Sequence, residues 1–188
     1  MPNFPNKNFI RLNFFLSLWV AYVNCLGAPL PKSETNIYHF SSSWTDDDGR
    51  TVSLSEWQGR STIIAMAYSD CTRVCSSTLR KLKEIEEIAN TQHLLFEIIV
   101  VSFDPTTDTQ EAWKFYRKKN NLVGDKRWHF LTGTDLNTKK LAHLLGVNYW
   151  MGLDHIIHDF RIVYVNSDGT VKSILDWDNQ DAMKFLEP

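Results

Sequence analysis

Two runs of β-branched and apolar residues, separated by a helix-length segment, constrain the fold more than any other feature of this chain. The runs are "STIIAMAYS" (61–69) and "LFEIIVVSFD" (95–104), and the centre of each is almost wholly apolar. Such runs indicate strands that are buried on both faces, as in a parallel sheet covered by helices. Between them, apolar residues recur at helical spacing: Leu79, Leu82, Ile85 and Ala89. The pattern predicts two parallel central strands joined by a crossover helix.

Helix and strand patterns alternate through the rest of the chain. "TDTQEAWKFYRKKN" predicts a helix capped by Thr107 or Asp108, and "DLNTKKLAHLLGV" predicts a helix that stops at Gly146. A short strand at "WHFLTG" lies between these helices. "HDFRIVYVNSDGTVKSIL" then reads as two strands joined by a turn at Asp168-Gly169, and "NQDAMKFLE" as a closing helix.

A hairpin is expected before the first buried run. "TDDDGRTVSL" (45–54) carries the turn Asp48-Gly49 between two short extended stretches. A βαβ unit followed by a ββα unit predicts the α/β class, with a central mixed sheet flanked by helices on both faces. This is a thioredoxin-like arrangement with an N-terminal β-hairpin. Its reactive position is the place where the first core strand turns into its helix.

The first 28 residues differ in kind from the rest. Lys7 and Arg11 precede an apolar run (14–23) and the small residues Gly27-Ala28, which is the pattern of a secretory signal peptide. The run is short of the roughly 20 residues that span a bilayer as a helix. We expect residues 1–28 to be a signal peptide or a retained membrane anchor, 29–36 a linker, and 37–188 the folded domain. This places the domain in an extracytoplasmic space, the periplasm or its equivalent, secreted or tethered to the membrane.

Composition narrows the function classes. Apolar residues make up 43% of the chain, which is enough for a sizeable core. The formal net charge is −2 and basic residues form only short runs, so no nucleic-acid partner is expected. We also expect each tryptophan outside the leader to lie in the core: Trp44, Trp57, Trp113, Trp128, Trp150 and Trp177.

Cys71 and Cys75, in "SDCTRVCSST", lie where the first core strand meets its helix. Four residues apart on a helix, they would share one face about 6 Å apart, within reach of a disulfide. The helix N-terminus and Arg73 favour thiolates there. Two thiolates are soft donors that suit Cu(I) or Zn(II), but two donors seldom hold a metal, so a third donor is expected elsewhere.

Two histidines in "LDHIIHDF" are the best candidates for that third donor. The segment precedes a late strand, where sheet neighbours of the first core strand are expected. His155 and His158 are three residues apart and point to opposite faces of an extended chain. At most one of them can face the cysteines.

Four segments together resemble the SCO/SenC family of membrane-tethered, thioredoxin-fold copper proteins, which help to assemble the copper centre of cytochrome c oxidase. They are "YSDCTRVCSSTLRKLKEI", "VVSFDPTTDTQEAWKFY", "WHFLTGT" and "HDFRIVYVNSDG", and the resemblance runs from about residue 38 to residue 175. His158 stands ten residues before Asp168, as the copper-ligand histidine of the family does. Aligning the Asp-His pair at His155 instead would require a three-residue insertion, so we prefer His158.

The resemblance implies a site for Cu(I) or Cu(II) made of Cys71, Cys75 and His158. It implies a metallochaperone and not an enzyme, with a copper-receiving partner such as a cytochrome c oxidase subunit. Asp104 matches an acidic residue of the family near the site. It either supports the site or only caps the loop before Pro105.

One departure from the family pattern keeps a second function open. The family usually has a proline after each cysteine, and this chain has Thr72 and Ser76. The alternative is an extracytoplasmic thiol–disulfide oxidoreductase, in which the pair cycles between dithiol and disulfide against a thiol redox partner, with Cys71 as the attacking thiol. Against this, thioredoxin-type enzymes have two residues between the cysteines and a cis-proline opposite, and residues 148–160 contain no proline. A purely structural disulfide is the third reading, but so small a loop stabilises little.

Overall fold

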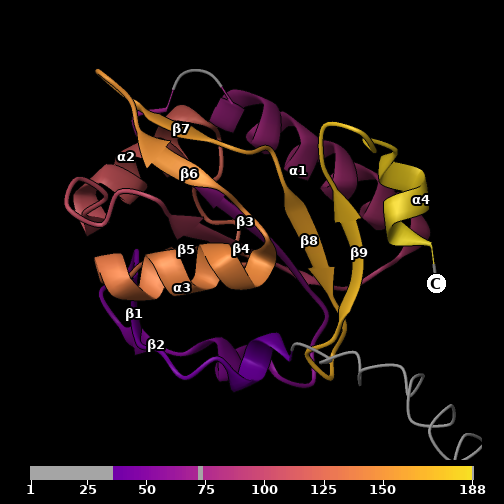
Figure 1. Ribbon diagram of the computed structural model, residues 1–188. Coiled ribbons are helices and arrows are strands. Elements are labelled where there is room, and N and C mark those ends of the chain that lie inside the picture. The colour runs from indigo at the N-terminus through magenta and orange to yellow at the C-terminus, as the bar shows by residue number, and fades with distance from the viewer. Residues whose placement is uncertain (1–35, 72–73, 188) are drawn as a thin grey trace, which may run out of the picture. The chain divides into compact units, whose positions relative to one another are not determined.

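The computed structural model describes residues 36–71 and 74–187 (Figure 1). The predicted leader, 1–28, lies outside these residues, as does the predicted linker up to residue 35. Asn36 begins the described chain and caps the 3-10 helix η2 (Ile37–His39), its side chain accepting from the N–H groups of Tyr38 and His39. Within the described ranges, no helix combines the length and the apolar character that a bilayer crossing requires.

A seven-stranded mixed sheet forms the centre of the domain, in the order β2-β1-β5-β4-β3-β8-β9. The two central strands, β3 and β4, are parallel, and so are β4 and β5. β8 runs antiparallel to β3, and β1 runs antiparallel to β5. The bounds are Trp44–Asp46 (β1), Thr51–Val52 (β2), Thr62–Ala67 (β3), Glu97–Ser102 (β4), Trp128–Thr132 (β5), Ile162–Val165 (β8) and Val171–Leu175 (β9). The predicted mixed sheet is confirmed.

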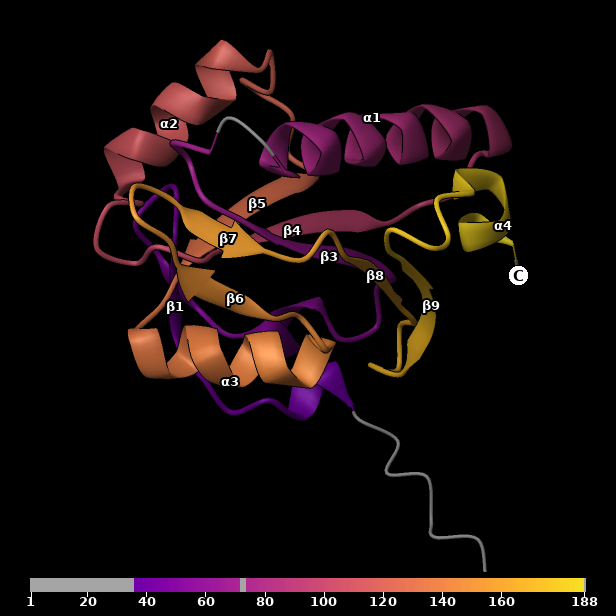
Figure 2. The same cartoon turned by 45° about the horizontal axis from the view of Figure 1, so that its top comes forward.

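Helices cover both faces of this sheet. α1 (Val74–Gln92) and α2 (Gln110–Lys119) lie on one face and α3 (Asp135–Leu145) lies on the other (Figure 2). The short α4 (Ala182–Leu186) packs against α1 and β9. All six residues of β3 are buried, because a helix layer lies above and below it. The thioredoxin-like α/β fold expected from the sequence is therefore confirmed.

The predicted N-terminal hairpin is present and short. β1 pairs with β2 in antiparallel register, with Trp44 opposite Val52. Gly49 sits in the turn at φ +86°, a conformation that residues with a side chain seldom adopt. The Asp46 carboxylate accepts the backbone N–H of Arg50 and so helps to close the turn.

The helix ends agree with the sequence in one case and correct it in the other. α3 begins at a cap where Thr134 accepts the N–H of Asn137, and it ends at Gly146 with φ +66°, as predicted. α2 is capped by Thr109, which accepts the N–H of Ala112, so the predicted cap at Thr107 or Asp108 was wrong. The Asp108 carboxylate is turned into the interior instead, where it binds other partners.

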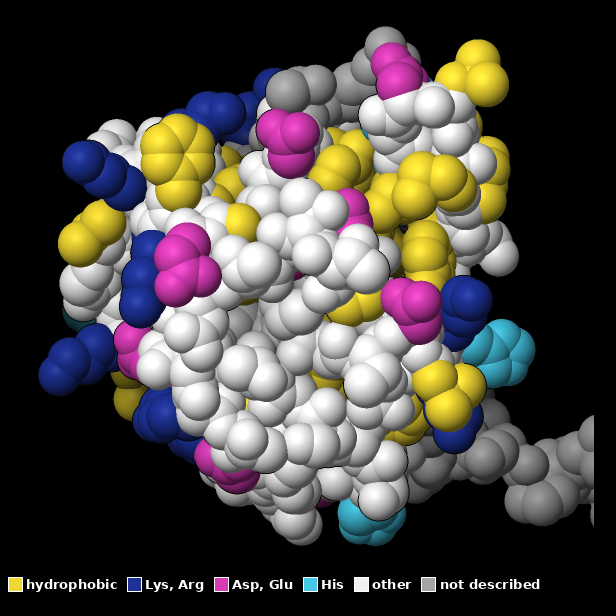
Figure 3. Space-filling view, turned by 90° about the vertical axis from the view of Figure 1, so that its left-hand side faces the viewer, with side chains coloured by type: hydrophobic (Ala, Val, Ile, Leu, Met, Phe, Trp, Pro, Cys, Tyr) yellow, Lys and Arg dark blue, Asp and Glu magenta, His cyan; other side chains and the backbone are white. Residues whose placement is uncertain are grey.

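The chain between α3 and β8 forms a separate two-stranded sheet that the sequence patterns did not resolve. β6 (Tyr149–Met151) and β7 (Ile156–His158) are antiparallel, with Tyr149 opposite His158. Figure 3 shows hydrophobic side chains gathered over this hairpin, at the upper right of the view. They include Met151 and Leu153, which are 72% and 107% exposed.

The tryptophan prediction holds for four positions and fails for two. The buried four lie on or beside the main sheet: Trp44, Trp57, Trp113 and Trp128. Trp150 and Trp177 are each 54% exposed. Trp150 belongs to the two-stranded sheet, whose outer face no described helix covers, and Trp177 lies in the loop after β9, against the ring of Phe160. Neither Trp150 nor Trp177 lies between the main sheet and its helices, where the four buried tryptophans pack.

Candidate metal centre

The two cysteines lie where the loop after β3 leads into α1. Cys71 lies before the helix, which begins at Val74, and Cys75 lies in the first helical turn. The prediction that both thiols share a helix face was therefore wrong for Cys71. The thiols meet because the chain turns back at Cys71, whose N–H donates to the carbonyl of Tyr68, 3.2 Å away.

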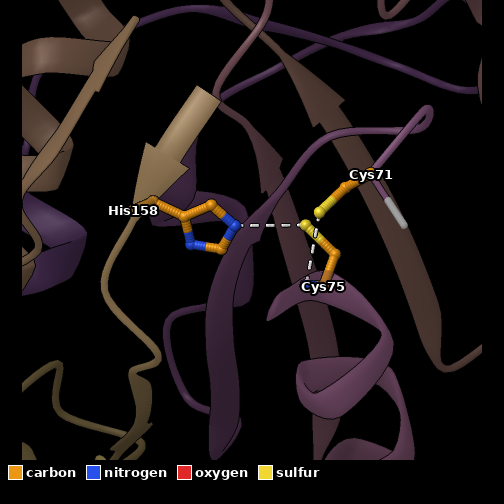
Figure 4. A group of neighbouring side chains, drawn as sticks. All are labelled: Cys71, Cys75 and His158. Atoms are coloured by element: carbon orange, nitrogen blue, oxygen red, sulfur yellow. Dashed lines mark hydrogen bonds between the residues drawn. The ribbon is translucent and has the colours of Figure 1, made fainter. Parts of the chain in front are cut away.

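The structure brings three soft donors together at this point. The Sγ atoms of Cys71 and Cys75 and a ring nitrogen of His158 all lie within 4.8 Å of one another. Cys75 Sγ is 3.2 Å from His158 Nε2, and the Cys75 N–H donates to Cys71 Sγ over 3.3 Å (Figure 4). No disulfide joins the two described cysteines. The donors come from two elements that are more than eighty residues apart in the sequence.

His158 is held with one nitrogen directed at the thiols. It is the last residue of β7, and its Nδ1 lies 2.8 Å from the backbone carbonyl of Asp159. A carbonyl oxygen only accepts hydrogen bonds, so Nδ1 carries the proton in the neutral ring. The lone pair of Nε2 is then directed toward Cys75, which is the tautomer that a metal ligand requires.

Aromatic rings enclose the donors. The ring of Phe103 lies 4.6 Å from the ring of His158, measured between centroids, and the ring of Tyr68 lies 6.2 Å from it. Cys75 and His158 are buried, at 1% and 5% exposure, whereas Cys71 is half-buried. A small hollow of about 140 Å³ opens beside Cys71. Cys71 is therefore the donor nearest to solvent.

His155, the other candidate for the third donor, lies away from the thiols. Its ring contacts the carboxylate of its neighbour Asp154, and its side chain is 31% exposed. His158 alone of the two faces Cys71 and Cys75. The alternation expected of an extended chain accounts for this, since β7 carries His158 on the face that points inward.

Burial changes the acid–base properties of the site. Burial raises the pKa of the Cys75 thiol well above its usual range, and the neighbouring Cys71 adds to the shift. Burial and Cys71 also raise the pKa of the Tyr68 hydroxyl. For Cys75 the direction of this shift is opposite to the lowered pKa expected at a helix N-terminus, because burial disfavours the charged thiolate. In the metal-free protein Cys75 is a neutral thiol that can donate to His158.

Asp108 supports the site, although the sequence analysis considered it only as a possible helix cap. It is 1% exposed, its Oδ1 accepts the N–H of Ser69 over 2.8 Å, and its Oδ2 accepts the hydroxyl of Ser102 over 2.5 Å. Burial raises its pKa. Asp108 thereby ties the loop before Cys71 to the end of β4. The segment "DPTTDT" contains both Asp104 and Asp108, and the sequence does not show which of the two enters the interior.

Asp104 closes its own turn. Its carboxylate accepts from the Thr106 hydroxyl over 2.7 Å and from the Thr107 N–H over 3.3 Å. These contacts favour the loop-capping alternative over direct support of the thiols. Of the two residues that replace the family prolines, Thr72 lies outside the described residues, and Ser76 is exposed in the first turn of α1.

The arrangement suits a soft metal better than thioredoxin-type exchange. Two sulfurs and one imidazole nitrogen are donors that Cu(I) favours, while structural zinc sites usually have four ligands. Thioredoxin-type enzymes place a cis-proline opposite the reactive pair. Among the described residues of this chain no peptide bond is cis.

Comparison with known proteins gives a family match over most of the chain. A family model described as SCO1/SenC matches residues 32–186. A curated relative, the SCO1 protein homolog of Bacillus subtilis, is 24% identical over 133 residues, which covers 69% of this chain and 68% of the relative.

Solved structures share the fold. Arabidopsis thaliana ScoI, a structure with copper bound, matches with a TM-score of 0.66 and 22% identity, over 77% of this chain and 90% of that one. A SCO1/SenC family lipoprotein from Bacillus anthracis matches with a TM-score of 0.67 and 17% identity, over 77% and 92% of the two chains. At these identities the likeness establishes the fold.

Proposed function

Because this chain belongs to the SCO1/SenC family, we propose that it is a copper-binding metallochaperone, which delivers copper during assembly of the copper centre of cytochrome c oxidase. The observation that carries the proposal is the convergence of Cys71, Cys75 and His158 within 4.8 Å. A structural relative was crystallised with copper bound, which supports the choice of metal.

The three side chains fit copper in chemistry as well as in position. Cys71 and Cys75 supply thiolate sulfur, and His158 supplies Nε2 in the required tautomer. Three soft or borderline donors match Cu(I), and the same set can hold Cu(II). The enclosing rings of Phe103 and Tyr68 keep the site poorly hydrated, which strengthens the bonds from a cation to the two sulfurs.

Each residue has a task in loading and release. Cys75 must give up its proton to bind, so copper uptake releases a proton from the thiol. Cys71, the most exposed donor, is the first sulfur that incoming copper meets and the last that outgoing copper leaves. Asp108 fixes the loop that carries Cys71 through its bond to Ser69.

Partner and location follow from the family and from the leader sequence. We propose a copper-receiving subunit of cytochrome c oxidase as the acceptor. The basic start and apolar run of residues 1–28 support an extracytoplasmic location, with this segment acting as a signal peptide or membrane anchor.

The experiment is a copper titration of the reduced protein under anaerobic conditions, with metal content measured after desalting. We expect one copper per chain in the wild type. His158→Ala should lose the copper, and the matched variant His155→Ala should keep it. Retention of copper by His158→Ala, or by Cys71→Ala, would contradict the proposed ligand set.

The same samples distinguish copper delivery from thiol redox work. If the wild type retains no copper while Cys71 and Cys75 cycle readily between dithiol and disulfide, the oxidoreductase alternative replaces the metallochaperone. Retention of copper together with slow exchange against a small-molecule disulfide supports the metallochaperone.

A further inference from the structure

Strand β6 has an open edge. Only β7 pairs with it among the described residues. Asn148 O accepts the N–H of Asp159, and the N–H of Gly152 donates to His155 O, so the hydrogen-bonding groups of these alternate residues point toward β7. In an antiparallel pair the intervening residues point the other way. The backbone N–H and C=O groups of Tyr149 and Met151 therefore face outward, unpaired within the described chain.

A groove runs along this open edge, between α3 and the β6–β7 hairpin. Its volume is about 760 Å³. One wall is formed by Lys139 and His143, one turn apart on α3, and the other by Tyr149 and Trp150 of β6. The buried side chain of Val147 lies at its end. An extended peptide can reach both the backbone of β6 and the side chains of α3 from this groove.

The charges along the groove favour an acidic occupant. Lys139 and His143 are exposed, and Lys139 forms no ion pair with another described residue. The guanidinium of Arg161 packs closely against Gly146 at the end of α3: a side chain at this position would place its Cβ atom 3.1 Å from Arg161 Nη1. Asp135, at the start of α3, is the acidic group near Tyr149. Two carboxylates lie near the groove: Asp135, and Asp159, which accepts from the N–H and side-chain amide of Asn148. Arg161 lies 3.7 Å from Asp176, so Lys139 is the groove cation that lacks an ion pair among the described residues.

We propose that the open edge of β6 binds an extended, acidic segment of another protein, which adds as a third strand to the β6–β7 sheet. Main-chain hydrogen bonds to Tyr149 and Met151 hold the added strand. Alternate side chains of the segment then face α3, where Lys139 attracts carboxylates, while apolar side chains cover the exposed ring of Trp150.

This groove is physically connected to the candidate metal centre. The Tyr149 ring lies 4.9 Å from the Phe103 ring, which lies 4.6 Å from the His158 ring. Tyr149 is also the β6 residue directly opposite His158. A bound segment is thus two ring contacts from the imidazole. The binding itself does not depend on copper, so it is tested separately from the proposed function.

The probe is a blocked peptide of about six residues, the usual strand length, with alternating glutamate and valine. It is added to the purified ¹⁵N-labelled protein, and the backbone amide resonances are followed by NMR. We expect saturable shifts centred on Tyr149 and Met151. The same peptide carrying N-methyl groups on alternate amides has lost strand-forming donors and should bind at least about tenfold more weakly.

Two pairs of variants locate the interaction. Met151→Pro removes the outward N–H while Met151→Ala keeps it, and proline is tolerated on an open strand edge. We expect Met151→Pro to bind the peptide about tenfold more weakly than Met151→Ala. Lys139→Glu should weaken binding several-fold, and Lys140→Glu, on the same helix but outside the groove, should not.

Several outcomes would overturn the proposal. These are no shift at about 1 mM peptide, equal binding of the N-methylated peptide, or equal binding by the Met151→Pro and Met151→Ala proteins. Concentration-dependent dimerisation that Met151→Pro abolishes would assign the edge to a second copy of this chain instead. Amide spectra of the variants that match the wild type outside the hairpin show that each has folded.

Discussion

The two ends of the central parallel strands have opposite chemistry. Cys71, Cys75 and Asp108 lie at the carboxyl ends of β3 and β4. Cys75 and Asp108 are buried and Cys71 is half-buried. Cys71 Sγ accepts the N–H of Cys75, and the Asp108 carboxylate accepts from the Ser69 N–H and the Ser102 hydroxyl. The polar groups at this end are therefore largely shielded from solvent.

At the amino ends of the same strands and of β5 lies a charged cluster. Glu97 accepts from Arg60 over 2.7 Å and lies 2.9 Å from His129 Nε2, and the edge of Trp57 packs on the His129 ring. Arg60 is half exposed. Solvent reaches this cluster, so its electrostatic interactions are weakened by water and salt.

The two histidines show what the difference teaches. Both His129 and His158 belong to strands and lie against aromatic rings. His129 has a carboxylate partner, whereas Nε2 of His158 has only a thiol partner and a buried setting. The two rings differ only in their neighbours, and these neighbours decide whether the imidazole contacts a carboxylate or is available as a metal donor.

The largest expected effect is loss of copper on removal of a donor at the carboxyl end. Cys75→Ser keeps the size of the side chain but replaces thiolate by a poor ligand for Cu(I). We expect the copper affinity to fall by more than the roughly 10–100-fold that loss of a supporting contact causes. Metal analysis after anaerobic desalting measures it, with Glu97→Gln at the amino end as the control. Equal copper content in the two variants would remove the distinction between the ends.

The second largest effect concerns Asp108. Asp108→Ala leaves the Ser69 N–H and the Ser102 hydroxyl without their buried acceptor, which should lower the free energy of unfolding by about 2 kcal/mol. Urea denaturation at neutral pH measures this. Asp104→Ala is the matched control, since its bonds are exposed, and should lose about 1 kcal/mol or less. Similar losses in both variants would show that the buried position of Asp108 is not important.

The same carboxyl predicts a pH dependence. Burial raises the pKa of Asp108 in the folded protein above the value of about 3.9 in an unfolded chain. The folded state then holds the proton more tightly, so the stability contributed by this group is complete below about pH 3.9 and is lost as the pH rises through the folded value. The stability of the wild type relative to Asp108→Asn should therefore be greater at pH 4 than at pH 7. A difference that grows with pH would refute the assignment.

The smallest expected effect lies at the amino end. Glu97→Gln removes the ion pair with Arg60 and the contact with His129, and should change the free energy of unfolding by about 1 kcal/mol or less. Denaturation at low and high salt should show the difference shrinking as salt rises. A loss as large as that of Asp108→Ala would mean that the exposed cluster matters as much as the buried one.

The sequence allowed much of this fold to be predicted. The two apolar runs (61–69 and 95–104) correspond to β3 and β4. The predicted helix end at Gly146 and the predicted turns at Gly49 and Gly169 are also present. These features are local, because periodicity and φ preferences act within a few residues. Errors arose where a side chain had two possible partners. Asp108 could cap a helix or enter the core, and only the buried Ser69 and Ser102 groups decided it.

The β6–β7 hairpin was missed for a related reason. Its strands are three residues each, too short for a periodic pattern, and Trp150 and Met151 resemble core residues although they are exposed. The two strands are defined by their pairing with each other, and this pairing exists only in the folded chain.

By itself the sequence determined the α/β class, the succession of the main strands and helices along the chain and the position of the cysteine pair, because hydrophobic periodicity and turn residues act over short distances. Only the tertiary structure decided that His158 meets Cys71 and Cys75, that Cys75 is a buried neutral thiol, and that Asp108 holds the cysteine loop. These depend on the packing of β7 and Phe103 against the end of β3, and so on contacts between segments that are far apart along the chain.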